Sequence, residues 1–575
     1  MNVIPSHGDS ESILQEESMK EILTEMGVKP THVRMALQRA QSTGESLPRI
    51  MRDFGFLTGE QVAIAVARQT GLDYFAAEKI DSINVDDFQG VELPEYHRFV
   101  PVGRVKEGEQ DVLLIAVPDD RVMNAAKNEF YKARVRMVIA SEHTIQTVYR
   151  KHFANTEAAF DKAVEEFMRS LNNSKSEEDG GLVRNVFGTL LRHSCYSGAS
   201  DLYLYKSEYV GLIKLKINGV GQMFRSIDSE LFDRLLTKLV TENTKVEDLR
   251  REPKESVIEF SEDDRKRYED IVSRFGFRLE LTESRMVRNA VVRILDKQSS
   301  ATELGKLGLD DQTLSSIRRL SKAATGLMIV TGPTGSGKTT TLYGMLKEID
   351  PVERSIQSIE NPVEYRHGLW QQYELPKSGG SEGEEMNKWL KALLRNAPDV
   401  ILVGEVRDRE AAAILMDAAN TGHLAFTTLH TNNAALALAR LARFHVDQAT
   451  LASVLLGVMA QRLLRVLCKD CRVVDDRPST MAELNQPYVT AHKHPHMPGK
   501  GCRNCDYTGY RGRRMIYELL EVTSDVRRLI EDGAAPSVVA SAGIKAGSSM
   551  WASGIKLVAD GVTSIDEVTR VALRD

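Results

Sequence analysis

A short run of small and basic residues, GPTGSGKTTT at 332–341, is the stretch whose residue types point most directly to chemistry. It fits the pattern G-x-x-x-x-G-K-[ST] and follows an apolar run at 327–331. Glycines let main-chain N–H groups curl around phosphate oxygens, and the start of a following helix adds partial positive charge. We expect Lys338 to reach the β- and γ-phosphates of ATP, and the Thr339 hydroxyl to bind Mg²⁺. The predicted nucleotide-binding residues are Gly332, Pro333, Thr334, Gly335, Ser336, Gly337, Lys338, Thr339 and Thr340.

Three carboxylates that follow this loop are candidates for the chemistry of hydrolysis. The apolar run 400–403 leads to Glu405, and a buried strand there would deliver a carboxylate to the Mg²⁺ shell. The segment SIENPVEY contains Glu360 and Glu364, and an acid near the γ-phosphate could orient or deprotonate the attacking water. A core strand that ends in a surface glutamate, and two solvated acids beside a proline turn, are the competing interpretations.

Two histidines flank a β-rich run in ANTGHLAFTTLHTNNA. His423 stands before the run and His430 after it, where Thr431 and Asn432 follow. A histidine at the end of a strand could contact phosphate or a neighbouring subunit. A purely structural role is the more common one for a single histidine.

Four of the five cysteines form two C-x-x-C pairs, Cys468 with Cys471 and Cys502 with Cys505. In a reducing compartment this spacing favours metal over disulfide. Four thiolates suit tetrahedral Zn²⁺ and leave no open coordination position, so the predicted zinc site is structural. The alternative is that two such pairs occur by accident.

The sequence pattern predicts that the elements which position these groups are strands that alternate with helices. The apolar runs before the glycine loop, before Glu405 and before His430 each predict a short strand. Earlier in the chain, DVLLIAV, VRMVIA, YVGLIKLKING and FGFRLELTE predict further strands. Residues 19–70 form a helical repeat, because Gly27 and Gly55 end similar apolar helices 28 residues apart. Thr58 and Gln61 predict a capping box in the second copy.

These patterns predict an α/β protein of several domains. We expect residues 1–17 to be disordered. The predicted domains are an N-terminal module at 1–152 (helical repeat 19–70, α/β part 72–152), a linker at 153–182, a second α/β domain at 183–298, a linker at 299–326, and a nucleotide-binding domain at 327–575 whose cysteine insert covers about 466–513.

Composition excludes several classes of protein. The chain has 575 residues, 42% hydrophobic and 27% charged, which is ordinary for a soluble globular protein. No apolar run approaches the roughly 20 residues that span a bilayer, and the polar, acidic N-terminus argues against a secretory signal. The net charge of −6 and the lack of a basic run argue against nucleic-acid binding. We therefore expect a cytoplasmic protein that reaches a membrane only through partners.

Four segments in this order, GPTGSGKTTTLY, IENPVEY, ILVGEVRD and TGHLAFTTLHTN, closely resemble the secretion ATPases of type II secretion and type IV pilus assembly. The resemblance covers about residue 183 to the end, and more weakly residues 19–152. It implies a hexameric motor with a RecA-like C-terminal domain and a PAS-like domain before it. The cysteine pairs imply the zinc insert of the assembly or secretion branch.

The resemblance also implies roles for particular residues. Glu364 would be the general base, with Glu360 supporting it, and Glu405 would be the acid on the magnesium side. His423 and His430 match the family's histidine box. Arg278 in FGFRLEL and Arg293 in VVRILDK match arginines that the family supplies from the preceding domain, and a guanidinium would stabilise charge on the transferring phosphoryl group. A structural salt bridge is the competing interpretation of these arginines.

Two departures from the family pattern affect the interpretation. Asn361 stands where the family usually has aspartate, so the turn keeps its size and loses a charge. The N-terminal repeat would dock on an inner-membrane partner, and some relatives bind cyclic di-GMP there through Arg-Leu-Gly openings. This chain has MKEIL and LPRIM instead, with Arg49 the only nearby basic residue in the second copy, so docking is the favoured interpretation.

The favoured function is an ATP-hydrolysing homohexamer that works with a platform protein of the inner membrane and a cytoplasmic docking protein of a pilus or secretion machine. Its cofactors would be ATP, Mg²⁺ and Zn²⁺. The alternatives are a nucleic-acid translocase of RecA-like type and a nucleotide-sensing scaffold with little turnover. ATPase activity stimulated by single-stranded DNA would favour the translocase.

Overall fold

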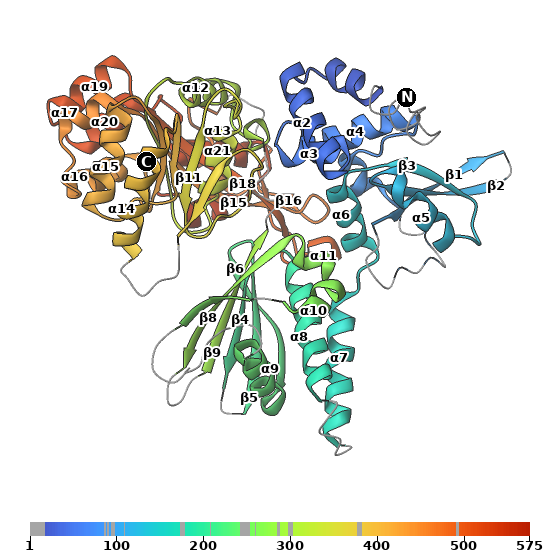
Figure 1. Ribbon diagram of the computed structural model, residues 1–575. Coiled ribbons are helices and arrows are strands. Elements are labelled where there is room, and N and C mark those ends of the chain that lie inside the picture. Colours follow the sequence, from blue (N-terminus) through green and yellow to red (C-terminus); the bar gives the residue numbers. More distant parts are fainter. Residues whose placement is uncertain are drawn as a thin grey trace, which may run out of the picture. The chain divides into compact units, whose positions relative to one another are not determined.

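The computed structural model divides the chain into two compact units, each described here by itself (Figure 1). The first unit comprises Met1–Leu215 with Met223–Ile294, and the second comprises Lys216–Gln222 with Leu295–Asp575. The structure describes residues 18–574 except 85–87, 89–90, 92, 94–97, 109, 173–178, 208, 242–253, 259, 284–287, 297–302, 376–381, 490–493 and 506. The segment 1–17, predicted to be disordered, lies outside the described residues.

The first unit opens with the helical repeat. Its helices are residues 18–25, α2 (Pro30–Thr43), α3 (Leu47–Asp53) and α4 (Gly59–Thr70). The second helix of each copy ends at a left-handed glycine, Gly44 with φ 72° and Gly71 with φ 67°. The predicted capping box is confirmed, because Thr58 and Gln61 exchange side-chain to main-chain hydrogen bonds at the start of α4.

A small α/β part follows the repeat. Its elements are η1 (Ala77–Ser82), β1 (Val100–Glu107), β2 (Gln110–Val117), η3 (Asp120–Val122), α5 (Met123–Glu129), β3 (Val135–Ile139) and α6 (Glu142–His152). β2 is the middle strand, antiparallel to β1 and parallel to β3. Both strands predicted in this region, DVLLIAV and VRMVIA, are confirmed.

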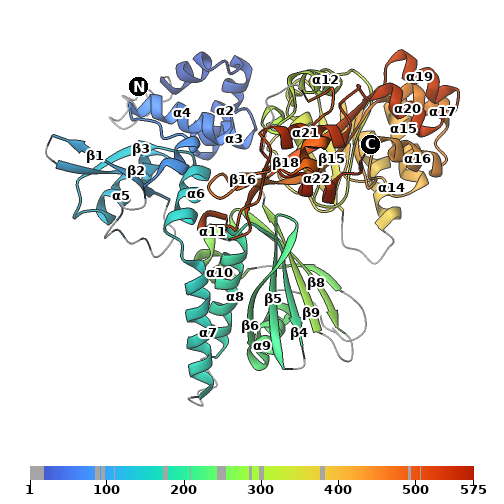
Figure 2. The same cartoon turned by 180° about the vertical axis from the view of Figure 1, so that it is seen from behind.

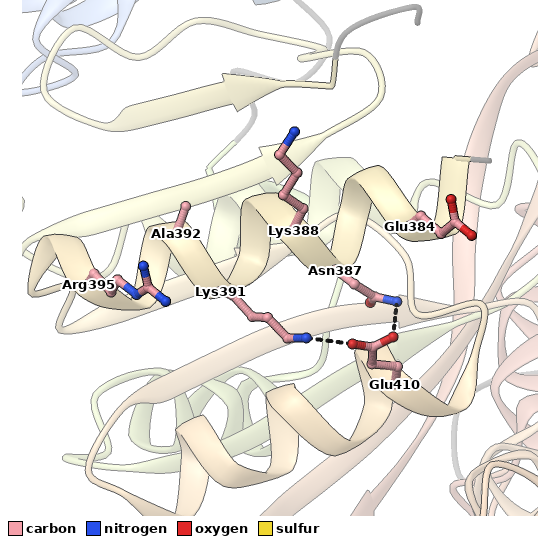
Figure 3. A pocket seen from close by; sticks show the side chains of 7 residues that line it. All are labelled: Glu384, Asn387, Lys388, Lys391, Ala392, Arg395 and Glu410. Atoms are coloured by element: carbon pink, nitrogen blue, oxygen red, sulfur yellow. Dashed lines mark hydrogen bonds and ion pairs between the residues drawn. The ribbon is translucent and has the colours of Figure 1, made fainter. Parts of the chain in front are cut away.

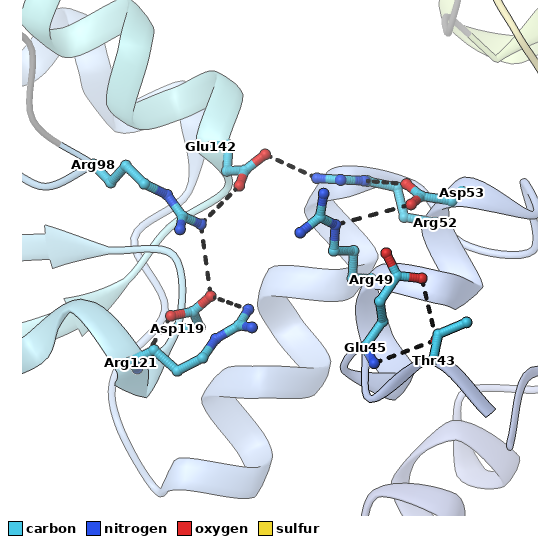
Figure 4. A network of polar contacts seen from close by, with 9 residues as sticks. All are labelled: Thr43, Glu45, Arg49, Arg52, Asp53, Arg98, Asp119, Arg121 and Glu142. Atoms are coloured by element: carbon cyan, nitrogen blue, oxygen red, sulfur yellow. Dashed lines mark hydrogen bonds and ion pairs between the residues drawn. The ribbon is translucent and has the colours of Figure 1, made fainter. Parts of the chain in front are cut away.

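A chain of ion pairs ties the helical repeat to this α/β part (Figure 4). Arg52 on α3 pairs with Glu142 at 2.8 Å, and Glu142 pairs with Arg98 at 3.1 Å. Asp119 continues the chain at 3.7 Å from Arg98 and 2.7 Å from Arg121. Each arginine in this series of ion pairs therefore already faces a carboxylate.

Two packed helices lead to a six-stranded sheet. α7 (Thr156–Asn172) and α8 (Asp179–Tyr196) lie side by side in both views (Figures 1 and 2). They occupy most of the described part of segment 153–182, and α8 crosses the predicted boundary at 183. The other elements are β4 (Ala199–Lys206), β5 (Val210–Ile217), β6 (Val220–Asp228), α9 (Ser229–Thr241), β7 (Lys254–Val257), α10 (Glu262–Arg267), α11 (Glu269–Val272), β8 (Phe275–Glu283) and β9 (Arg288–Asp296). The sheet order is β6-β5-β4-β9-β8-β7.

The second unit is built on a seven-stranded sheet with the order β12-β11-β13-β14-β10-β15-β18. Its strands are β10 (Gly326–Thr331), β11 (Ile356–Glu360), β12 (Gln371–Glu374), β13 (Val400–Val403), β14 (Leu424–Leu429), β15 (Leu455–Leu467) and β18 (Tyr510–Glu521). Neighbouring strands are parallel except β18, which is antiparallel to β15. The central strands are apolar runs because both faces of the sheet are covered.

Helices cover both faces of this sheet. They are η5 (Leu304–Lys306), α12 (Asp311–Ser321), α13 (Lys338–Leu346), α14 (Glu382–Leu393), η6 (Leu394–Asn396), α15 (Arg409–Asn420), α16 (Ala434–Arg443), α17 (Gln448–Val454), α19 (Ser524–Glu531), α20 (Pro536–Gly543), α21 (Met550–Ala559) and α22 (Ile565–Val571). Along β10, Met328 and Val330 join the core under α12 and α13, whereas Leu327 and Ile329 join the core under α15 and α16. Figure 2 shows α21 beside β18 and α22 beside β15.

The cysteine-bearing segment connects β15 to β18. It contains β16 (Val473–Val474), α18 (Pro478–Glu483), β17 (His496–Met497) and η7 (Arg503–Cys505), and β16 pairs with β17 in a separate two-stranded sheet. Among the helices that the structure describes, none is long and apolar enough to cross a bilayer.

Candidate active site

Four neighbouring strands bring most of the predicted site residues to one edge of the sheet. β10 ends at the glycine loop, β14 ends just before His430, β13 ends just before Glu405, and β11 ends at Glu360. Because these strands are adjacent and parallel, their carboxyl ends lie in a row. In open α/β sheets this edge is where ligands bind.

Gln461 on β15 supports the glycine loop. A side chain at Gly332 would place its Cβ 2.4 Å from the Gln461 carbonyl oxygen and 2.6 Å from Ser336 Oγ, so only glycine fits. Gly337 has φ 87°, which glycine adopts without strain. The Gln461 side chain is fully buried and donates from Nε2 to the Ser336 carbonyl at 2.8 Å. The strand next to β10 therefore fixes the shape of the loop.

The Lys338 ammonium lies against the first residues of the loop. Its Nζ donates to the carbonyls of Gly332 at 2.9 Å and Pro333 at 3.2 Å. Burial lowers the pKa of Lys338 to about 8, although the charge of Glu405 opposes the shift. A half-buried cation whose hydrogen-bond partners are neutral carbonyls fits an incoming phosphate.

The start of α13 also fits a phosphate. No side chain caps α13 at Gly337, whereas Asp408 caps α15 and Asn433 caps α16 in the same unit. The first N–H groups of a helix need partners from elsewhere when no cap supplies them. Thr339, whose hydroxyl we predicted to bind Mg²⁺, lies in this first turn.

The depressed pKa of Lys338 predicts proton uptake on nucleotide binding. At pH 8 about half of the Lys338 side chains are neutral, and the triphosphate favours the charged form, so binding should take up roughly half a proton per site. ATP affinity should fall as the pH rises through 8. Calorimetry at pH 8 in two buffers with different ionisation heats measures the uptake. A Lys338→Arg variant should show none, and uptake that persists in this variant would place the proton on another group.

Glu405, His430 and Arg407 form a charged cluster beside the loop. Arg407 Nε donates to Glu405 Oε2 at 2.9 Å, and His430 Nε2 lies 3.5 Å from the same oxygen. Burial and then the charge of Lys338 lower the pKa of His430, which leaves its imidazole neutral at pH 7. A carboxylate at this position suits contact with a phosphate-bound Mg²⁺, and a neutral imidazole can donate a hydrogen bond to a phosphate oxygen.

Glu360 is buried under the row and bonded to neutral groups. Its carboxylate accepts from Tyr343 Oη at 2.6 Å, from Ser358 Oγ at 2.7 Å and from Gln372 Nε2 at 3.4 Å. Burial raises its pKa, and the hydrogen bonds oppose the shift. Tyr343 belongs to α13, so Glu360 joins the helix after the glycine loop to β11. Glu364 is half-buried in the turn that follows β11, which leaves it better placed than Glu360 to meet a water molecule.

Three predicted residues are not brought to this edge within the second unit. His423 precedes β14 and therefore lies at the opposite, amino edge of the sheet, where its Nδ1 contacts the Ala418 carbonyl at 2.8 Å. Arg293 lies on β9 of the first unit and donates from Nε to Asp201 on β4 at 3.1 Å. Arg278 lies half-buried on β8 of the same unit, opposite Val257. Arg293 thus forms a salt bridge, which was the competing interpretation, and a catalytic role of both arginines stays a prediction.

The four paired cysteines converge. Their sulfur atoms all lie within 4.8 Å of one another, with 3.7 Å between Cys468 and Cys502, 3.7 Å between Cys471 and Cys505, and 3.8 Å between Cys502 and Cys505. Tetrahedral zinc with Zn–S bonds of about 2.3 Å requires sulfurs about 3.8 Å apart, whereas a disulfide requires about 2.05 Å. The main-chain N–H groups of Cys502 and Gly509 point at Cys505 Sγ at 3.2 and 3.3 Å, as a thiolate requires. The cluster therefore fits a metal ion.

Zinc content provides a direct test of this cluster. We expect one zinc ion per chain in protein purified without chelator, and loss of zinc in a Cys468→Ser/Cys502→Ser variant. Mass spectrometry of the metal measures both. Cys195→Ala is the matched control, since Cys195 is buried in the first unit and should not change the zinc content. Full zinc retention in the double variant would contradict the assignment.

A separate cavity of about 510 Å³ lies on α14 and α15 (Figure 3). Its lining residues are Glu384, Asn387, Lys388, Lys391, Ala392, Arg395 and Glu410. Lys391 and Asn387 both point to the Glu410 carboxylate, at 2.6 and 3.2 Å. None of these residues belongs to the row described above, so the cavity is distinct from the nucleotide site.

Three residues of the site were not predicted: Gln461 under the loop, and Tyr343 and Gln372 around Glu360. A glutamine within a strand carries no pattern that distinguishes it from a solvated residue. Tyr343 was detectable in principle, because it lies on the first turns of the helix after the loop, where a buried hydroxyl needs a partner.

A glycine loop with a half-buried lysine, and acids in a row beside it, are what an enzyme needs to bind and split a nucleoside triphosphate. The second unit is thus of the P-loop ATPase class. Comparison with known proteins narrows this class: the sequence profile described as "Type II/IV secretion system protein" matches residues 175–570. The chain belongs to this family and is an ATP hydrolase.

Individual relatives agree with the family. The chain is 34% identical to the type II secretion system protein E of Dickeya dadantii over 403 residues, which are 69% of this chain and 76% of that protein. It is 31% identical to the type IV pilus assembly ATPase TfpB of Acinetobacter baylyi over 425 residues, 71% of this chain and 69% of that one. Similarity to the type IV pilus assembly ATPase PilB of Thermus thermophilus, at 29% identity, extends over 89% of this chain and 58% of that protein. The recognition made from the four sequence segments is confirmed.

Proposed function

We propose that this chain is the motor of a type II secretion or type IV pilus machine, and that it works as a homohexamer on the cytoplasmic side of the inner membrane. The observation that carries the proposal is the row of Glu360, Glu405, His430 and the glycine loop at one sheet edge, with Glu364 in the turn that follows Glu360. The names of the relatives, which include both secretion and pilus ATPases, support the choice of machine.

In the proposed reaction, water attacks the γ-phosphorus of ATP, the bond to the bridging oxygen breaks, and ADP and phosphate leave. Glu364 orients the water and accepts its proton. Lys338 and the main-chain N–H groups of the loop hold the β- and γ-phosphates. Thr339 and Glu405 would hold Mg²⁺, which when bound supplies charge neutralisation on the phosphate oxygens. Glu360 anchors the segment that carries Glu364.

The first unit would complete the motor. We assign its six-stranded sheet with α9 to a PAS-like domain, and we propose that Arg278 and Arg293 stabilise phosphoryl charge in a neighbouring active site. Arg293 would then exchange Asp201 for phosphate. The N-terminal module would dock on a partner at the membrane. The arginines of its ion-pair series already face carboxylates, which leaves them less suited to an anionic ligand. Cyclic di-GMP is less favoured for this module than a docking partner. Arg49 is 54% exposed, but its guanidinium already lies 3.9 Å from the Asp53 carboxylate.

Crosslinking of the full-length chain in membranes of its host tests this proposal. We expect crosslinks to a membrane protein of a pilus or secretion machine, together with ATP hydrolysis and a six-fold assembly by light scattering. Strong stimulation of hydrolysis by single-stranded DNA without such a crosslink would instead identify a translocase. Absence of hydrolysis in the complete protein with its metals would overturn the motor.

A further inference from the structure

The side chain of Gln372 on β12 makes four contacts with three parts of the active site. Its Oε1 accepts from the main-chain N–H of His367 at 2.7 Å. Its Nε2 donates to the Tyr365 carbonyl at 2.9 Å, and lies 3.2 Å from Tyr343 Oη and 3.4 Å from Glu360 Oε1. One amide therefore holds the turn between β11 and β12 at two points, and joins it to α13 and to β11.

The residue that this turn carries is Glu364, which directly precedes Tyr365. The turn has no helix or strand of its own, so its conformation depends on such contacts. Two further contacts assist: Val363 N–H donates to Glu374 at 3.3 Å, and the His367 ring stacks on Trp370 at 4.2 Å. Gln372 holds the turn through two main-chain groups and also reaches the buried Glu360. Tyr343 assists it, since its ring meets the Tyr365 ring at 6.5 Å and its hydroxyl donates to Glu360.

We propose that Gln372 is a positioning residue for hydrolysis, which sets the turn so that the Glu364 carboxylate meets the attacking water. The proposal rests on the assignment of Glu364 as the base. The hydrogen bonds of Gln372 to described residues go to Tyr343, Glu360, Tyr365 and His367 and not to the glycine loop, so its loss should alter the chemical step and leave nucleotide binding intact. An error of about 1 Å in the position of a catalytic group can cost on the order of 100-fold in rate.

The test compares three variants of the full-length protein. Gln372→Ala removes the amide and its volume, whereas Gln372→Met keeps the volume and removes the hydrogen bonds. Gln371→Ala is the control, because Gln371 is the exposed neighbour on the same strand. Phosphate release gives kcat, fluorescence titration gives the Kd for ATP, and thermal unfolding gives Tm.

We expect kcat to fall by about 10- to 100-fold in both Gln372 variants, with the Kd for ATP within about twofold of the parent. The control should keep the parent kcat. If Gln372→Met keeps full activity, packing and not hydrogen bonding is the role, and the proposal fails. A rise in Kd that matches the loss of kcat would equally overturn it. If Glu364→Gln is inactive while both Gln372 variants are fully active, only this inference fails and the proposed function stands.

Discussion

ATP hydrolysis should fall by about 100- to 1,000-fold in kcat when Lys338 is replaced by alanine, and ATP binding should weaken as well. The half-buried ammonium lies against the loop and is the charge that would stabilise the γ-phosphate in the transition state. Phosphate release measures the first effect, and titration with a fluorescent nucleotide measures the second. Lys388→Ala is the control, because that lysine is 77% exposed on α14.

The contrary result would be informative. If the Lys338→Ala protein hydrolyses ATP at the parent rate, the loop does not carry the reaction, and the P-loop assignment of this chain is wrong. If binding is lost but the rate at saturating ATP is unchanged, Lys338 contributes only to ground-state affinity.

Glu364→Gln should lower kcat by about 100- to 10,000-fold with little change in the Kd for ATP, because the amide keeps the shape of the side chain and cannot accept a proton. Glu360→Gln is the matched comparison. Glu360 is bonded to Tyr343, Ser358 and Gln372, so its loss should disturb the turn and reduce kcat less than loss of Glu364. Both rates come from phosphate release at saturating ATP.

The pair of variants separates two assignments. If Glu360→Gln abolishes turnover while Glu364→Gln retains it, the base is Glu360 and the turn serves another purpose. If both retain turnover, neither carboxylate is the base and water is activated by the phosphate itself.

The strands that carry the site could be predicted closely from the sequence. The strand at 400–403 and the strand LAFTTL match β13 and β14, and the strand at 327–331 differs from β10 by one residue. These runs are continuous and apolar because helices cover both faces of the sheet, and such runs stand out from their surroundings. The cysteine cluster was predictable for a similar reason, since the spacing of metal ligands is a local property.

The order of the strands could not be read from the sequence. That β14 lies between β13 and β10 depends on packing between distant segments, and this order places His430 beside the loop, whereas His423 lies at the opposite edge because it precedes β14. The contacts of Gln461 and Gln372 were missed for the same reason. Each glutamine hydrogen-bonds to a segment that is distant along the chain or lies across a turn. The residues next to it in the sequence therefore give no indication of its role.

β15 runs from Leu455 to Leu467 with an irregularity in its pairing between Arg465 and Leu467, supports the glycine loop at Gln461 and leads directly to Cys468. Side chains alternate between the faces of a strand, so a deletion of one residue after Gln461 would turn every later side chain to the wrong face. We therefore expect selection to remove insertions and deletions between Gln461 and Cys468 in sequences that descend from this one. They should accumulate instead between Cys471 and Cys502, where the chain can change length while the cysteines at both ends would hold the proposed metal ion.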